Sequence, residues 1–160
     1  MKSPFEDLQI DPSLVCEFFA VFSRFEYAMK ATRYCGADRY QNAVPDWRGL
    51  QGHLGEPLAA STDEGLRAAI GYLLAEPPQV QKVINDRPQF QASPLAGANT
   101  GAQALEAARR VRNNLFHGGK HTAHSPPERD TRLIDAALTV LQACLSLSPD
   151  LESEYDHQVV

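Results

Sequence analysis

The sequence has few cysteines, and none is placed to form a metal or redox motif. Its 160 residues include three cysteines, Cys16, Cys35 and Cys144, and no pair has the Cys-x-x-Cys spacing of a zinc or redox site. The odd number also leaves one cysteine without a partner for a disulfide. We therefore expect reduced thiols in a cytoplasmic protein.

Long apolar runs and an excess of positive charge are also missing. No stretch reaches the roughly 18–20 apolar residues of a membrane-spanning helix, and Glu6 and Asp7 stand where a signal peptide needs an apolar segment. We therefore expect neither secretion nor membrane insertion. Fifteen Lys and Arg against twenty Asp and Glu give a net charge of −5, which argues against the broad basic surface of a non-specific nucleic-acid binder.

The length and composition are those of one globular domain. Apolar residues make up 43% of the chain and charged residues 22%, which is ordinary for a globular protein. The last eleven residues hold four acidic side chains, Asp150, Glu152, Glu154 and Asp156. We expect a single helical domain over residues 1–148 and an acidic, flexible C-terminal tail over residues 149–160.

Apolar residues recur at helical intervals in four segments. They predict four main helices at about residues 12–34, 61–76, 100–117 and 127–148. Asp11 and Pro12 mark the start of the first helix, and capping-box patterns that begin at Ser61 and Thr100 mark the next two.

The remaining segments are predicted as short helical pieces and loops. A piece that begins after Pro45 is shortened by nearby glycines and closed by Pro57. Residues 78–99, rich in Pro, Gly and polar side chains, are predicted as a loop with one helical turn at residues 80–84. Because no strand or hairpin signal is evident, the predicted fold class is all-α, an antiparallel bundle of four main helices plus short helical pieces.

The segment from Arg109 to Lys120, RRVRNNLFHGGK, concentrates polar groups at the end of an otherwise apolar helix. Arginine binds phosphate as a fixed charge, histidine transfers protons near neutral pH, and asparagine can orient either one. The glycines after His117 let its ring turn back, so that Arg112 and His117 can face one pocket. This set suits phosphodiester chemistry without a metal. The alternative is that the arginines and His117 merely stabilise the helix C-terminus.

The string RVRNNLFHGGK, at the end of the third main helix, resembles the HEPN (higher eukaryotes and prokaryotes nucleotide-binding) family, whose nucleases carry an R-x4-6-H motif. Glu26 and Lys30 in the first helix form an E-x3-K pattern that some HEPN ribonucleases share. The resemblance implies a homodimer that cuts RNA with no metal or other cofactor, as a toxin or phage-defence effector. By position it implies that His117 transfers protons, Arg112 holds the scissile phosphate and Asn113 orients them.

Other residues near the motif are candidates for substrate binding. We expect RNA affinity to depend on a basic cluster of Arg109, Arg110, Arg112 and Lys120. Glu26 lies on the apolar stripe of the first helix, where an unpaired carboxylate is costly. It either pairs with Arg112 or a nearby arginine and aims it, or forms a surface pair with Lys30.

The chemistry itself gives a reason for a dimer. Attack by a ribose 2′-OH on the adjacent phosphate needs one group to accept a proton and another to protonate the leaving 5′-oxygen. One His117 per chain does half of this, and a two-fold interface brings two copies into one cleft. The first helix, rich in Phe, is expected to be core or dimer interface.

Several features leave alternatives open. HEPN toxins that are silenced by nucleotidylation have a tyrosine two residues after the motif histidine, whereas this chain has Gly119. That mode of control is not expected, although an antitoxin or other regulatory protein remains a possible partner. Trp47 either stacks on a base or anchors the core.

Two other kinds of function remain as alternatives. His117, His121 and His124 have a spacing that invites a metal-dependent hydrolase, with Glu128 nearby. A non-catalytic HEPN-like interaction module that binds a nucleotide or a partner protein is the main rival to the nuclease.

Overall fold

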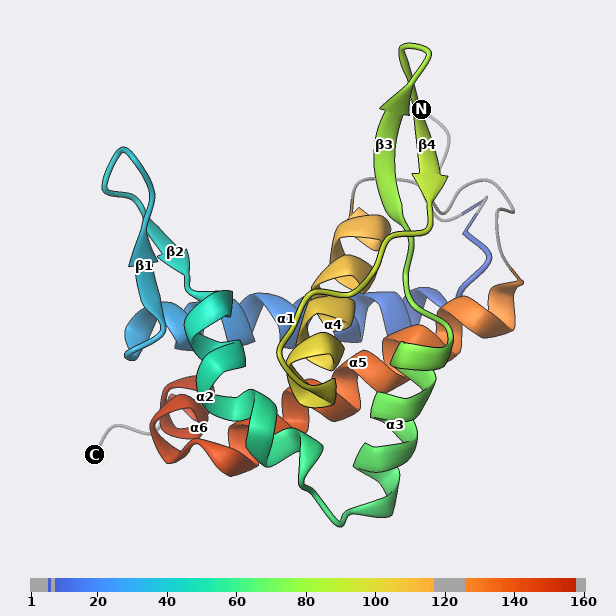
Figure 1. Cartoon of the computed structure of the whole chain (residues 1–160). Helices are drawn as coiled ribbons and strands as arrows, with labels where there is room; N and C mark the ends of the chain where they lie inside the picture. Colours follow the sequence, from blue (N-terminus) through green and yellow to red (C-terminus); the bar gives the residue numbers. More distant parts are fainter. Residues whose placement is uncertain (1–5, 7, 117–125, 158–160) are drawn as a thin grey trace.

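The computed structural model of the chain describes residue 6 and residues 8–116 and 126–157. In this part of the chain, six helices form the body and two β-hairpins project from it (Figure 1). The helices are α1 (Pro12–Ala31), α2 (Trp47–Ala59), α3 (Glu64–Ala75), α4 (Thr100–Phe116), α5 (Pro127–Leu147) and α6 (Pro149–Asp156). The strands are β1 (Cys35–Ala37), β2 (Ala43–Pro45), β3 (Val80–Ile84) and β4 (Arg87–Gln91).

The core lies where α4 crosses the other helices. α4 packs against α2, α3 and α5, and α1 packs against α5 and α6. Phe18 and Phe25 of α1, Leu105 of α4 and Leu141 of α5 are all fully buried in one cluster. The predicted predominance of helix is thus confirmed, and the four main predicted helices correspond to α1, α3, α4 and α5.

Helix caps explain where these helices begin. Asp11 caps α1 as predicted, since its carboxylate accepts from Ser13 N at 2.9 Å. The capping residues of the next two helices were predicted wrongly. At the start of α3, Asp63 Oδ1 accepts from Leu66 N at 2.7 Å. At the start of α4, Asn99 Oδ1 accepts from Ala102 N at 2.9 Å. Asp63 and Asn99 are therefore the caps, rather than Ser61 and Thr100.

The crossing of α2 and α4 depends on glycine. A Cβ at Gly101 would overlap the carbonyl oxygen of Gly55, and a Cβ at Gly55 would lie 3.1 Å from Cβ of Ala102. These glycines therefore serve close helix packing rather than ending the helix. The sequence predicted that Pro57 would close this helix, but Pro57 lies inside α2. The helix continues past it, with a 2.9 Å hydrogen bond from Ala60 N to Glu56 O in the last turn.

The two hairpins correct the prediction of an all-α fold without strands. β1 pairs with β2, and β3 pairs with β4 from Val80↔Gln91 to Ile84↔Arg87, where a loop with one helical turn was predicted. Asn85 and Asp86 have φ values of 50° and 59° and form the tight turn. Pro88, read as a loop signal, is compatible with β4 because a two-stranded hairpin has free edges.

The C-terminal region also differs from the prediction. Residues Pro149–Asp156 form α6 instead of a flexible tail. Leu151 is fully buried, and the helix packs on α1 and α5. Two of the acidic residues, Asp150 and Glu152, lie in its first turn, where negative charge stabilises a helix. No helix in the described ranges is long and apolar enough to cross a membrane.

Candidate functional site

Four polar side chains from three helices form a chain of hydrogen bonds beside the end of α4. Trp47 Nε1, from α2, donates to Glu26 Oε1, from α1, at 3.1 Å. Arg112 Nη2 donates to Glu26 Oε2 at 2.7 Å, and Arg112 Nη1 donates to Asn113 Oδ1 at 2.9 Å. Each carboxylate oxygen of Glu26 therefore has its own donor, and the guanidinium is held at both of its terminal nitrogens.

Aromatic rings fix the same guanidinium from its faces. The Cζ atom of Arg112 lies 5.1 Å from the ring centroid of Phe22 and 5.9 Å from that of Phe116, within the range of a cation–π contact. Phe116 follows Arg112 by four residues on α4, and Phe22 precedes Glu26 by four on α1, so helical spacing places each ring beside its polar neighbour. Arg112 is thus positioned before any ligand arrives.

This positioned arginine borders a pocket of about 210 Å³. The residues that line it are Phe22, Glu26, Pro45, Trp47, Arg109, Arg112 and Asn113. The side chain of Arg112 keeps 29% of its surface exposed and that of Glu26 keeps 20%. Arginine has five N–H donors, and the bonds to Glu26 and Asn113 use two of them. The pocket can therefore present the remaining donors to an anionic oxygen.

The structure brings most of the predicted site residues in the described ranges into this pocket. Arg112, Asn113, Glu26 and Arg109 all line it. Of the two alternatives for Glu26, the structure has the pair with Arg112. Lys30 is exposed on α1 and does not line the pocket.

The remaining predicted residues lie outside the described residues. These are His117 and Lys120, together with His121 and His124 of the metal alternative. In the sequence, His117 directly follows Phe116, the last residue of α4.

Arg110 does not belong to the basic cluster in which the sequence placed it. Its side chain is only 10% exposed. Nη1 and Nη2 donate to the carbonyl oxygens of Ser93 and Pro94 at 2.7 and 2.6 Å, and Nε donates to Glu106 Oε1 at 3.1 Å. Arg110 therefore ties the segment before α4 to the helix, and its guanidinium is bonded to groups of the protein rather than offered to a ligand.

Of the two alternatives predicted for Trp47, the structure has the core anchor, while the contact of Trp47 with Glu26 was not predicted. Trp47 is 5% exposed, and its ring stacks on Phe22 and Phe25 with centroid distances of 5.4 and 5.9 Å. Stacking on an RNA base is therefore wrong for Trp47, which anchors the core and holds Glu26. Trp47 lies 21 positions after Glu26 in the sequence, so no local spacing signals their contact.

Metal ligation finds no support among the residues that the structure describes. In those ranges no group of three or more His, Cys, Asp or Glu side chains could hold a metal ion.

Comparisons with models of protein families, with curated proteins and with solved structures found no match. A functional proposal therefore rests on the geometry of the Arg112 pocket and on the sequence motif around it.

Proposed function

We propose that the chain is a metal-independent endoribonuclease of the HEPN type that cuts RNA by attack of a 2′-OH. One observation carries the proposal. Arg112 is held by Glu26 at 2.7 Å and by Asn113 at 2.9 Å at the edge of a polar pocket, with donors left over. A preorganised guanidinium stabilises the charge that develops on a phosphate during cleavage, and His117 follows one residue beyond the end of the same helix.

The proposed mechanism gives each side chain one task. Arg112 binds the scissile phosphate, and Asn113 and Glu26 keep its guanidinium in place. His117 removes the proton of the 2′-OH, and His117 of a second copy protonates the 5′-oxygen that leaves. Arg109, whose side chain is 40% exposed, and Lys120 contact the RNA backbone.

A homodimer follows from this division of labour, and an exposed apolar pair supports it. Phe19 and Phe116 are 51% and 42% exposed, and their rings stack at a centroid distance of 5.1 Å. The Phe116 ring also lies 5.9 Å from Arg112 Cζ, so two-fold contact through this pair would bring two pockets together. The proposed setting is a cytoplasmic toxin or phage-defence effector under the control of an antitoxin or other regulatory protein.

One observation favours a second candidate function. The carboxylate of Glu26 neutralises Arg112, which reduces the attraction of the pocket for a phosphate. In a non-catalytic HEPN-like interaction module, this ion pair would be structural, and the surface near Phe19 and Phe116 would bind a nucleotide or a partner protein.

Expression in bacteria separates the two candidates. We expect induction of the wild-type chain to stop growth and the His117→Ala variant to restore it. His53→Ala, which removes an exposed histidine of α2 outside the pocket, is the matched control and should remain toxic. A chain that is harmless, or equally toxic with and without His117, would support the interaction module instead.

A further inference from the structure

A second polar pocket adjoins the Arg112 pocket at the foot of the β3–β4 hairpin. Its volume is about 290 Å³, and its lining residues are Val80, Gln81, Arg110, Asn113 and Asn114. Asn113 lines both pockets, so they meet at α4. We propose that this second pocket binds a base of an RNA strand whose phosphate lies at Arg112. The inference rests on the proposed ribonuclease function and adds a base subsite to it.

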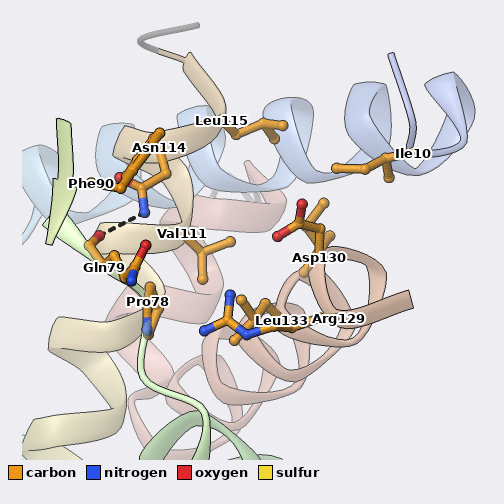
Figure 2. A pocket seen from close by; sticks show the side chains of 11 residues that line it. Ile10, Pro78, Gln79, Phe90, Val111, Asn114, Leu115, Arg129, Asp130 and Leu133 are labelled. Atoms are coloured by element: carbon orange, nitrogen blue, oxygen red, sulfur yellow. Dashed lines mark hydrogen bonds between the residues drawn. The ribbon is translucent and has the colours of Figure 1, made fainter. Parts of the chain in front are cut away.

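Hydrogen bonds fix the orientation of two amides in this pocket. Asn114 Nδ2 donates to Gln79 O at 2.7 Å, which leaves Asn114 Oδ1 as an acceptor. Figure 2 draws this bond in a neighbouring pocket that Asn114 also lines. Asn113 Oδ1 accepts from Arg112, which leaves Asn113 Nδ2 as a donor. The edges of unpaired bases carry both donors and acceptors, so a free donor and a free acceptor that line one pocket can both bond to a base. Gln81, exposed on β3, adds an amide that can adapt.

The rest of the pocket suits a single-stranded RNA better than a free anion. Arg110 forms a fixed wall, because its guanidinium is already bonded to Glu106 and to two carbonyl oxygens. Val80 supplies an apolar surface against which a base can pack. Lys82 follows Val80 by two residues and so shares its face of the hairpin. Two cations of the hairpin, Lys82 and Arg87, are exposed to solvent.

The projecting hairpin extends this surface away from the helices (Figure 1). On the face that carries Val80 and Lys82, Arg87 pairs with Ile84 near the tip. Cations along such an arm contact backbone phosphates, whereas the amides below contact a base, and sequence-specific RNA recognition uses unpaired bases in this way. The RNA would therefore run from the Arg112 pocket across Asn113 towards the hairpin.

Binding of a non-cleavable RNA tests this inference without relying on catalysis. The probes are a 2′-O-methyl hexanucleotide of defined sequence and the same strand with an abasic nucleotide at each position in turn, measured by fluorescence anisotropy. Val80→Phe fills the pocket, and Val83→Phe is the matched control, because Val83 lies on the same strand and is 78% exposed. Gln81→Ala, at an exposed position, removes one amide without a risk to folding.

We expect one abasic position to weaken binding to the wild type by about 10-fold, as the loss of a well-paired base does. The Val80→Phe variant should bind the intact strand as weakly as the wild type binds that abasic strand. It should also bind the intact strand and the abasic strand with equal affinity. Val83→Phe should match the wild type, and Gln81→Ala should lie between. Equal affinity of all abasic strands, with RNA still bound by Val80→Phe and Gln81→Ala, would overturn the base subsite and leave the nuclease proposal standing. No binding of any strand by the wild type would contradict both proposals.

Discussion

Arg110 and Arg112 stand two residues apart on α4, yet the protein uses them in opposite ways. The side chain of Arg110 is 10% exposed, and all three of its guanidinium nitrogens donate hydrogen bonds to other groups of the protein. Arg112 is 29% exposed and is held by one carboxylate and one amide at the rim of a pocket. The partners of an arginine, more than its position in a basic cluster, therefore decide whether it can bind a ligand.

The largest expected effect is on activity at Arg112. Arg112→Ala should lower the single-turnover rate of RNA cleavage by about 10²–10³-fold, as the loss of a positioned donor to a developing charge does. Arg112→Lys should recover little of this rate, because an ammonium cannot bridge Glu26 and a phosphate with a planar fork. Cleavage rates and thermal unfolding measured on the same samples check this prediction. A near-normal rate for Arg112→Ala in a folded protein would remove Arg112 from the site.

The largest expected effect on stability is at Arg110. Arg110→Ala leaves the carbonyl oxygens of Ser93 and Pro94 without their donor and Glu106 with one partner fewer, so it should cost about 2–4 kcal/mol in the free energy of unfolding. Urea denaturation is the measurement. A loss no greater than that of a surface variant would show that Arg110 does not tie residues 93–94 to α4.

Trp47→Phe should have a moderate effect, because it keeps a ring in the core and removes only the donor to Glu26. We expect a loss of about 1 kcal/mol in stability, the usual value for one hydrogen bond, together with a several-fold slower cleavage rate. Phe25→Leu, which alters the same aromatic cluster but keeps the Trp47 donor to Glu26, is the control for packing. If both variants slowed cleavage equally, Trp47 would act only as a core residue.

The smallest expected effect is at Arg109. Its side chain is 40% exposed and its partner Glu106 lies 3.2 Å away on the same helix, so Arg109→Gln should change stability by less than about 0.5 kcal/mol. If Arg109 contacts a phosphate, the slope of log affinity for RNA against log salt concentration should fall by about 1. An unchanged slope would leave Arg109 without a role in RNA binding.

Local signals in the sequence predicted the positions of α1, α3, α4 and α5, but neither α6 nor the two hairpins. The apolar spacing and Asp11 mark α1 correctly. Gly55 was predicted to shorten a helical piece, but it allows close packing of α2 against α4. β1 and β2 have three residues each, and Pro88 lies within β4. Strands this short, at free edges, carry too little alternation to be recognised.

The site was predictable only in part, for a similar reason. The cost of an unpaired carboxylate predicted a partner for Glu26, either an arginine such as Arg112 or Lys30, and the structure has Arg112, 86 positions away in the sequence. A spacing of two residues places Arg110 and Arg112 on different sides of α4, although both were predicted in one basic cluster. Which of the two arginines is buried depends on where residues 93–94 pack against α4. The contact of Trp47 with Glu26 depends on how α2 packs near α1. Both are tertiary facts that no local pattern contains.

Cleavage of a labelled mixed-sequence RNA and of total tRNA in excess EDTA tests the central proposal most directly, with the wild type compared with Arg112→Ala and His117→Ala. We expect the wild type to cut RNA, to leave 2′,3′-cyclic phosphate ends and to spare DNA, which lacks the attacking hydroxyl. Both variants should lose this activity. An intact RNA after incubation with a folded, dimeric wild-type protein, or cutting that EDTA abolishes, would contradict a metal-independent ribonuclease at Arg112.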